Sequence, residues 1–257
     1  MTLVVLGSGS RGNAVALATP DGLILIDAGF GPRTLARRLK AAGLPTEPIL
    51  GILITHEHGD HARGAIPLAR KTHAPILASA GTLRALRVPT AIEVIPLSAY
   101  QNIAFAGMTV TACPVPHDAA EPIAVSLEGF GHRIAVALDV GRTTSGLELL
   151  LRGASTVVLE ANHDDILLRT GRYPPSVRER IAGSGGHLSN RAAAELLESV
   201  CHAGLETVVL AHLSAQCNTP ALARAAAIAA LRRRGFRGNL LVAEQDQPLA
   251  VPAPRAA

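Results

Sequence analysis

Short apolar runs separated by turn-forming residues make up the first half of the chain. They lie between Gly/Ser/Asn clusters or beside the Pro-Asp-Gly turn, a pattern that predicts β-strands. Ile49–Ile54 is apolar throughout, which predicts a strand buried on both faces. Helical spacing over Arg33–Ala42, followed by Gly43 at a C-cap position, predicts a helix. Further strands are predicted at Leu3–Leu6, Ala14–Ala18, Leu23–Asp27, Ile76–Ala78, Ala91–Ile95, Met108–Pro114, Ile123–Leu127 and Arg133–Leu138.

Strands and helices alternate in the second half. The tail Pro252–Ala257 is expected to be loose. Strand-rich segments with helices to one side in each half predict an α/β fold, an αββα sandwich of two mixed β-sheets flanked by helices. No linker interrupts the pattern, so we expect a single domain over residues 1–257. Helices are predicted at Thr144–Leu151, Pro174–Ala182, Ser189–Ala203 and Pro220–Arg234, and strands at Thr156–Glu160, Thr207–Ala211 and Asn239–Ala243.

The composition is that of a globular protein with an aliphatic core. Hydrophobic residues make up 48% of the chain and charged residues 17%, which excludes a disordered protein. Aromatic residues make up only 2%, with no Trp, so stacking platforms for bases are hard to build. The net charge of +4 comes almost entirely from arginine. It permits an anionic substrate, but solubility alone also explains it.

Cysteine usage and the N-terminus bear on the compartment. Cys113, Cys201 and Cys217 are far apart and lack CxxC spacing, which argues against a disulfide framework and a structural cysteine–zinc site. The segment Met1–Leu6 has no basic region before it and is predicted to be a first strand rather than a signal peptide. No apolar run reaches the length of a membrane span. We therefore expect a cytoplasmic protein with no membrane partner.

The strongest chemical feature is Thr55-His56-Glu57-His58-Gly59-Asp60-His61, directly after a predicted strand. Side chains alternate in extended chain, so His56 and His58 point the same way, while Asp60 and His61 follow the turn. Imidazoles packed this closely repel once protonated, and a metal ion satisfies them all. A solvated polar loop is the alternative. The segment predicts a metal-dependent hydrolase.

A metal centre needs more ligands than one loop supplies. Three more His or Asp residues follow predicted apolar strands, namely His117, Asp139 and His212. Each alone is an ordinary capping or surface residue. Together with the first cluster they predict one shared centre.

This set of residues resembles the metallo-β-lactamase superfamily over nearly the whole chain. The resemblance implies two divalent metal ions, and Asp27 would support the metal-binding loop without being a ligand. We expect Zn²⁺ first, with Mn²⁺ and Fe²⁺ as alternatives, since all three accept these ligands. The implied ligands are His56, His58 and His117 for one metal and Asp60, His61 and His212 for the other, with Asp139 bridging both.

Within that superfamily the chain resembles the YycJ-like (WalJ-like) branch, which is related to nucleic-acid-processing members. Two residues depart from the pattern without removing a ligand: Leu138 stands where Thr is common, and Cys217 where the first of two Asn residues is common. The segments that carry this resemblance are Leu6–Asn13, Leu159–Asp164, Gly186–Asn190 and Leu210–Ser214.

A second pair of residues bears on the reaction. Glu160 and His187 match the places of a Glu–His dyad in related tRNA 3′-end-processing endonucleases, where a carboxylate holds an imidazole that protonates the leaving group. A strand-end salt bridge for Glu160 and a helix-cap neighbour for His187 are the alternatives. His163 is a rival for the same role. The predicted catalytic residues are Asp60, Glu160 and His187.

Two further features are weaker. The Gly7–Asn13 loop offers successive N–H groups of the kind that bind anions, although on its own a tight turn between two strands is the better explanation. Arg232–Arg234 and Arg237 could grip phosphates, but cations also suit the end of the preceding helix.

The resulting hypothesis is a two-metal phosphodiesterase or nuclease. A hydroxide shared by the metals would attack phosphorus while His187 protonates the departing oxygen. The substrate would be DNA, RNA or a small phosphodiester. A thioester, lactone or β-lactam hydrolase on the same scaffold is the alternative, followed by a di-iron redox protein and a non-catalytic metal-binding module. The oligomeric state is open, with a homodimer as one option.

Overall fold

The computed structural model describes residues 1–252, which form two β-sheets and the helices around them. The predicted loose tail lies, apart from Pro252, outside the described residues. The strands are β1 (Thr2–Gly7), β2 (Ala14–Thr19), β3 (Gly22–Ile26), β4 (Ile49–Leu53), β5 (Ile76–Ala78), β6 (Val94–Pro96), β7 (Asn102–Phe105), β8 (Met108–Pro114), β9 (Ile123–Gly129), β10 (His132–Ala137), β11 (Thr156–Glu160), β12 (Thr207–Ala211), β13 (Asn239–Val242) and β14 (Leu249–Val251). The helices are α1 (Pro32–Ala41), α2 (Gly59–Ala62), α3 (Ala65–Thr72), α4 (Ala80–Leu86), α5 (Ser145–Leu151), α6 (Asp165–Thr170), α7 (Pro175–Ala182), α8 (Asn190–Val200) and α9 (Pro220–Arg233).

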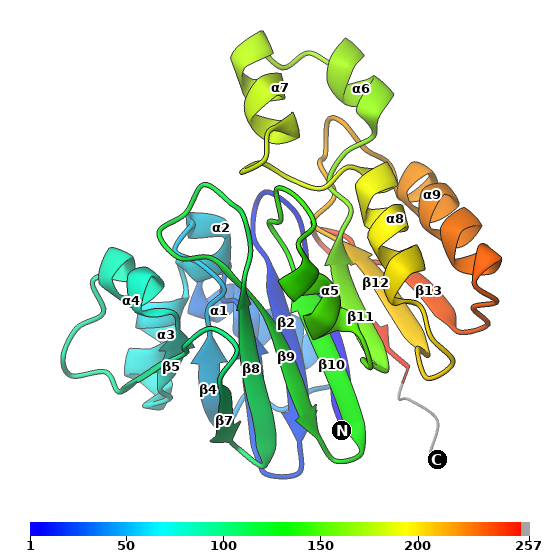
Figure 1. The fold of residues 1–257 in the computed structure, drawn as a ribbon. Coiled ribbons are helices and arrows are strands. Elements are labelled where there is room, and N and C mark those ends of the chain that lie inside the picture. Colours follow the sequence, from blue (N-terminus) through cyan, green and yellow to red (C-terminus); the bar gives the residue numbers. More distant parts are fainter. Residues whose placement is uncertain (253–257) are drawn as a thin grey trace.

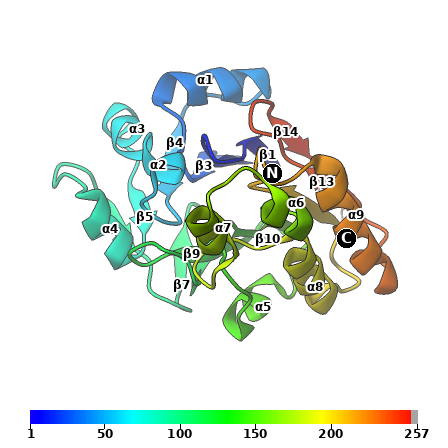
Figure 2. The ribbon, with the colours of Figure 1, turned by 90° about the horizontal axis from the view of Figure 1, so that it is seen from above.

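Each sheet has seven strands, and the two sheets pack face to face (Figure 1). The first has the order β14–β1–β2–β3–β4–β5–β6, and the second β13–β12–β11–β10–β9–β8–β7. Helices α1 and α3 cover the first sheet, while α5, α8 and α9 cover the second (Figure 2). This arrangement confirms the predicted αββα sandwich of two mixed sheets.

Both sheets change direction in the same way. From β14 to β3 the neighbouring strands are antiparallel, and from β3 to β6 they are parallel. The second sheet is antiparallel from β7 to β10 and parallel from β10 to β13. The switch therefore falls at β3 in one sheet and at β10 in the other. In open α/β sheets, ligands bind beyond the carboxyl ends of strands at such switch points.

The strands are apolar on both faces because both faces are covered. In β1, Val5 packs into the layer between the sheets, while Val4 and Leu6 pack under the outer helices. Alternation of apolar and polar residues is therefore absent from this strand, as expected for a sheet buried on both sides. In α1, Leu35 and Leu39 are one turn apart and bury the same face against the sheet.

Most predicted elements are present within a residue or two of their predicted ends, with two clear differences. The strand predicted at Ala91–Ile95 begins only at Val94, because Ile92 N–H bonds to the Pro89 carbonyl (2.9 Å) and closes a turn. The helix predicted at Ser189–Ala203 ends at Val200, because Cys201 is extended (ψ 129°). Elements that the sequence did not predict are α2, α3, α4, α6, β7 and β14. No helix among residues 1–252 combines the length and the apolar character that crossing a bilayer requires.

Candidate metal centre and active site

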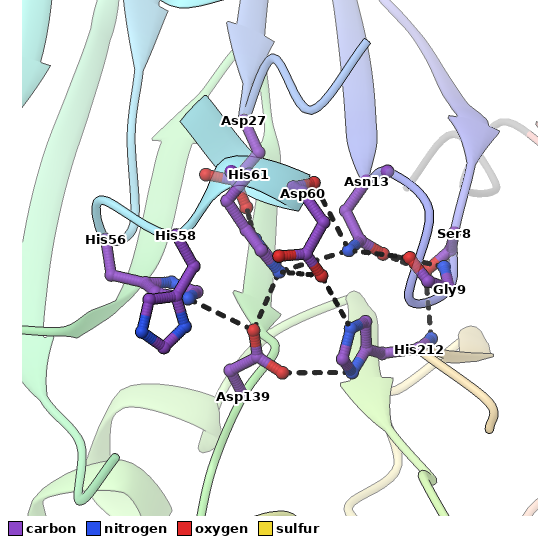
Figure 3. A network of polar contacts seen from close by, with 12 residues as sticks. Ser8, Gly9, Asn13, Asp27, His56, His58, Asp60, His61, Asp139 and His212 are labelled. Carbon is purple, nitrogen blue, oxygen red and sulfur yellow. Dashed lines mark hydrogen bonds and ion pairs between the residues drawn. The ribbon is translucent and has the colours of Figure 1, made fainter. Parts of the chain in front are cut away.

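The structure brings the predicted ligands to one edge of the sandwich, where strands of both sheets end. Asp27 follows β3, and His56 follows β4. Asp139 follows β10, His212 follows β12, and Glu160 is the last residue of β11. The side chains of His56, His61 and His212 converge on Asp139 (Figure 3).

One group of ligand atoms comes from His56, His58, His117 and Asp139. Asp139 Oδ2 lies 3.2 Å from His56 Nε2 and 4.0 Å from His117 Nε2. His117 Nε2 lies 3.4 Å from His58 Nδ1. All four ligand atoms lie within 4.8 Å of one another, close enough to share one cation.

A second group comes from Asp60, His61, Asp139 and His212. Asp139 Oδ2 lies 2.7 Å from His61 Nε2. Asp60 Oδ2 lies 3.5 Å from His212 Nε2 and 3.7 Å from His61 Nε2. Asp139 belongs to both groups, and the two groups divide the residues as the resemblance implied.

The histidine rings are oriented by partners at Nδ1, which turns Nε2 toward the centre. His61 Nδ1 lies 2.7 Å from Asp27 Oδ2, and His117 Nδ1 lies 3.0 Å from the Gly186 carbonyl oxygen. His212 Nδ1 lies 3.0 Å from Glu160 Oε1. Metal-binding histidines characteristically donate the other ring N–H to a carboxylate or a carbonyl. Asp27 thus lies behind His61, and its Oδ1 also accepts the N–H of Thr55 at 2.9 Å.

Two observations show that these residues fit metal ions: buried polar atoms that lack hydrogen bonds, and the distances between the ligand atoms. The Nε2 atoms of His56 and His212 and the Oδ1 atom of Asp139 are buried and make no hydrogen bond, although carboxylate or imidazole groups lie nearby. Buried polar atoms without partners are costly, and a cation would satisfy all three. Two nitrogens bound to one tetrahedral Zn²⁺ lie about 3.4 Å apart. The nitrogens of His58 and His117 have that separation, at 3.4 Å.

Electrostatics of the second group also favour a cation. Burial alone lowers the pKa of His61, but the carboxylates of Asp139 and Asp27 outweigh it and raise the pKa to about 10. Burial raises the pKa of Asp139, but nearby His212 and His61 bring it well below its usual value. A proton on His61 therefore neutralises part of the carboxylate charge. A cation held by these ligands would supply the same charge neutralisation in place of that proton.

Glu160 and His187 form a close pair beside Asp139. His187 Nδ1 lies 2.7 Å from Glu160 Oε1 and 3.0 Å from Asp139 Oδ1. Glu160 Oε2 accepts the N–H groups of Val140 (2.8 Å) and Leu188 (3.1 Å), which fix the carboxylate. The sequence predicted these two residues as a dyad, and the structure places them in contact.

Charge keeps this pair ionised. Burial by itself raises the pKa of Glu160, but the charge of His187 and hydrogen bonds from His187 and His212 lower it to about 2. Burial lowers the pKa of His187, yet Glu160 and Asp139 raise it to about 9. These carboxylates favour the imidazolium form of His187, which is able to donate a proton.

The Gly7–Asn13 loop braces the metal centre, and its N–H groups are directed into the protein. The N–H groups of Ser8, Gly9, Arg11, Gly12 and Asn13 all donate to protein oxygen atoms. Ser8 Oγ accepts the N–H of His212 at 2.8 Å, and Asn13 Nδ2 lies 3.1 Å from His61 Nε2. The sequence raised an anion-binding role for this loop, and these contacts favour the turn instead.

His163, Arg232–Arg234 and Arg237 lie apart from the two ligand groups. His163 pairs with Ser189 in an isolated β-bridge and is buried. Arg232–Arg234 lie at the end of α9 away from the metal centre (Figure 1), where Arg233 Nε bonds to Glu198 Oε1 at 3.0 Å. Arg237 follows in the same region. The sequence reasoning missed Asp118, Tyr173 and Arg180, which line a cavity of about 260 Å³ at the metal centre.

Comparison with known proteins places the chain in a family. The family model described as "Beta-lactamase superfamily domain" matches residues 23–213, so the chain belongs to the β-lactamase superfamily. It is 35% identical over 237 residues to the exodeoxyribonuclease YycJ of Bacillus anthracis, covering 90% of this chain and 89% of that protein. It is 30% identical over 226 residues to the exodeoxyribonuclease WalJ of Streptococcus pneumoniae D39, covering 85% and 84%. Its family within the superfamily is that of YycJ and WalJ, which confirms the resemblance drawn from the sequence.

Solved structures show the same fold at lower identity. The metallo-β-lactamase fold protein YhfI from Bacillus subtilis is similar with a TM-score of 0.74 at 17% identity, covering 97% of this chain and 98% of that one. The short form of human tRNase Z has a TM-score of 0.67 at 18% identity, covering 98% and 100%. These two similarities establish the fold.

Proposed function

We propose that the protein is a metal-dependent exodeoxyribonuclease that hydrolyses phosphodiester bonds. The observation that carries the proposal is the His187–Glu160 pair beside Asp139, because an alkoxide leaving group needs a proton and the Glu160 carboxylate, 2.7 Å from His187 Nδ1, favours a protonated imidazole. The names of YycJ and WalJ support DNA as the substrate and attack from a strand end.

Each residue has a distinct proposed role. His56, His58 and His117 would hold one divalent cation, Asp60, His61 and His212 the other, and Asp139 both; Zn²⁺ is proposed first. When bound, two such cations supply charge neutralisation at the phosphate and an activated water. Glu160 keeps His187 charged and aimed, and His187 donates its proton to the departing oxygen. Asp60 is proposed to act at the same centre as a ligand close to the reacting water.

The first experiment measures hydrolysis of linear and covalently closed circular DNA by the purified protein with Zn²⁺ or Mn²⁺. We expect linear DNA to be degraded from an end and closed circles to resist. A thioester and a β-lactam serve as competing substrates for the acyl-hydrolase alternative. Failure to cleave any DNA while both metal groups are loaded would overturn the proposal.

The second experiment tests the proton donor. His187→Ala is expected to lower kcat on DNA by about 10²- to 10⁴-fold, the range for loss of general-acid catalysis. Metal content should be unchanged if the two proposed ligand sets hold the metals, and it is measured in parallel because His187 also lies within ligand distance of Asp139, Glu160 and His212. His132→Ala is the matched control, since His132 begins β10 at the end opposite Asp139. Equal activity of both variants would show that His187 is not the proton donor.

A further inference from the structure

A helical hairpin, formed by α6, α7 and the turn between them, stands over the metal centre. It projects beyond the ends of the strands (Figure 1), and from above it lies over the middle of the sandwich (Figure 2). Its packing is its own: Leu168 and Ile181 form a small buried cluster with Cys217, separate from the main cores. The hairpin is therefore a roof attached to the fold by few apolar contacts.

The cavity under this roof is lined both by hairpin residues and by the candidate metal ligands. It has a volume of about 260 Å³, with Tyr173, Val177 and Arg180 on the hairpin side and ligand residues such as Asp60 on the other. A strand end that reaches the candidate metal ligands in this cavity therefore also meets the hairpin residues.

The hairpin concentrates positive charge. Residues 165–182 carry four arginines against two acidic residues, a net charge of +2, whereas the whole chain carries +4. Arg180 is the arginine on the cavity wall. Its Nη1 lies 3.3 Å from Asp118 Oδ2, and Asp118 Oδ1 lies 3.2 Å from His117 Nε2. Asp118 thus holds the guanidinium next to the metal centre, while 64% of the Arg180 side chain is exposed and can reach a phosphate.

Tyr173 supplies an aromatic surface at the same cavity. The chain has only two tyrosines and no Trp, yet one of the tyrosines is in the hairpin turn and lines the cavity. It is half-buried against Leu168 and its neighbours, which limits its freedom. An aromatic ring beside an arginine is the combination that binds single-stranded nucleic acid, by stacking and by contact with the backbone.

We propose that the α6–α7 hairpin holds the end of a single DNA strand, with Tyr173 stacked on the terminal base and Arg180 bound to a backbone phosphate. This inference rests on the proposed function and names the form of its substrate. On this proposal, one strand of a duplex end separates from its partner before it enters the cavity.

Binding is tested separately from hydrolysis, with a short fluorescein-labelled oligothymidylate and metal-loaded protein carrying His187→Ala. Tyr173→Ala is expected to weaken binding about 5- to 150-fold, the range for loss of one base–aromatic stack. Tyr173→Phe should bind like the parent because the ring is kept, and it also controls for folding of the hairpin. Equal binding by the Ala and Phe variants would overturn the role of Tyr173.

Salt dependence tests Arg180. Removing one phosphate contact from a single strand lowers the slope of log Kd against log salt by about 0.7. We expect that decrease for Arg180→Ala and no change for Arg237→Ala, which removes the same charge far from the cavity. An unchanged slope for Arg180→Ala would overturn its phosphate contact.

The kinetics of hydrolysis then test whether Tyr173 stacks on the terminal base. Tyr173→Ala should raise KM on a normal strand end and leave kcat nearly unchanged. On a strand whose terminal nucleotide lacks a base, the parent and Tyr173→Ala should become equal. A persistent difference on that substrate would overturn stacking. DNA binding by the parent without hydrolysis would contradict the proposed function but not the hairpin's role, whereas hydrolysis that is insensitive to Tyr173 and Arg180 would contradict only the hairpin's role.

Discussion

Asp27, Asp139 and His212 share a backbone conformation that side chains rarely adopt. Their φ angles are 61°, 53° and 53°. Each such residue costs about 1–3 kcal/mol and persists only where the surroundings impose it. The surroundings here are specific: Asp27 N–H bonds to the Leu53 carbonyl at 2.7 Å, and His212 N–H bonds to Ser8 Oγ at 2.8 Å. The strain turns each side chain from its strand toward the shared centre.

Substitution of Asp27 tests whether a single residue behind the metal ligands supports metal binding. Because its carboxylate orients His61 and holds the Thr55 N–H, Asp27→Ala is expected to lower metal affinity about 10- to 100-fold. The measurement is competition for Zn²⁺ with a chromophoric chelator. Asp21→Ala, in the exposed β2–β3 turn, is the control. A folded Asp27→Ala protein with the parent's affinity would contradict a supporting role.

At the level of elements, each sheet has an aspartate within two residues of the end of one of its strands. β3 is followed by Asp27-Ala28-Gly29, and β10 by Leu138-Asp139-Val140-Gly141. Both strands lie where antiparallel pairing changes to parallel, so both aspartates lie at switch points. Asp139 reaches the ligand groups directly, whereas Asp27 acts behind His61.

The long apolar elements and the ligands at strand ends could be predicted from the sequence, but the position of the α6–α7 hairpin could not. Ile49–Ile54 and Thr207–Ala211 are short β-branched and Leu-rich runs, a strong local signal for buried strands. The turn at Ala106 and Gly107, both at positive φ, joins β7 to β8, but β7 is too short and too exposed to give such a signal. The place of α6–α7 depends on packing against Cys217, which is distant in sequence, and local pattern does not encode that contact.

Truncation of an apolar side chain should have a different effect on stability in the hairpin than in the central strands. Leu159, in β11, is fully buried in the core under α5, α8 and α9. Leu159→Ala is expected to lower the free energy of unfolding by about 2–5 kcal/mol. Leu168→Ala removes the same atoms from the small hairpin cluster, so it should mainly permit local opening.

Thermal unfolding and amide hydrogen exchange distinguish these two effects. Leu159→Ala should lower Tm clearly. Leu168→Ala should leave Tm near that of the parent and accelerate exchange chiefly in residues 165–182. A large drop in Tm for Leu168→Ala would show that the hairpin folds cooperatively with the sheets, which would contradict the description of it as a weakly attached roof.

At the scale of the whole molecule, the metal centre joins the two sheets. The first sheet is followed by the His56–His61 segment, and the second supplies His117, Asp139 and His212. A cation bound by ligands from both sheets would link the two sheets at this edge. Metal binding and stability of the fold are therefore expected to be coupled.

This coupling predicts that metal removal destabilises the protein. With Zn²⁺ at a hundredfold excess over its Kd, one site stabilises the folded state by about 2.7 kcal/mol. For a chain of this size, each kcal/mol shifts Tm by about 2–4 °C, so chelation should lower Tm by about 5–11 °C per site. Asp139→Ala should abolish most of the difference, because Asp139 belongs to both ligand groups. Identical Tm values with and without metal, when metal analysis shows occupancy, would mean that the ligands from the two sheets do not share their cations.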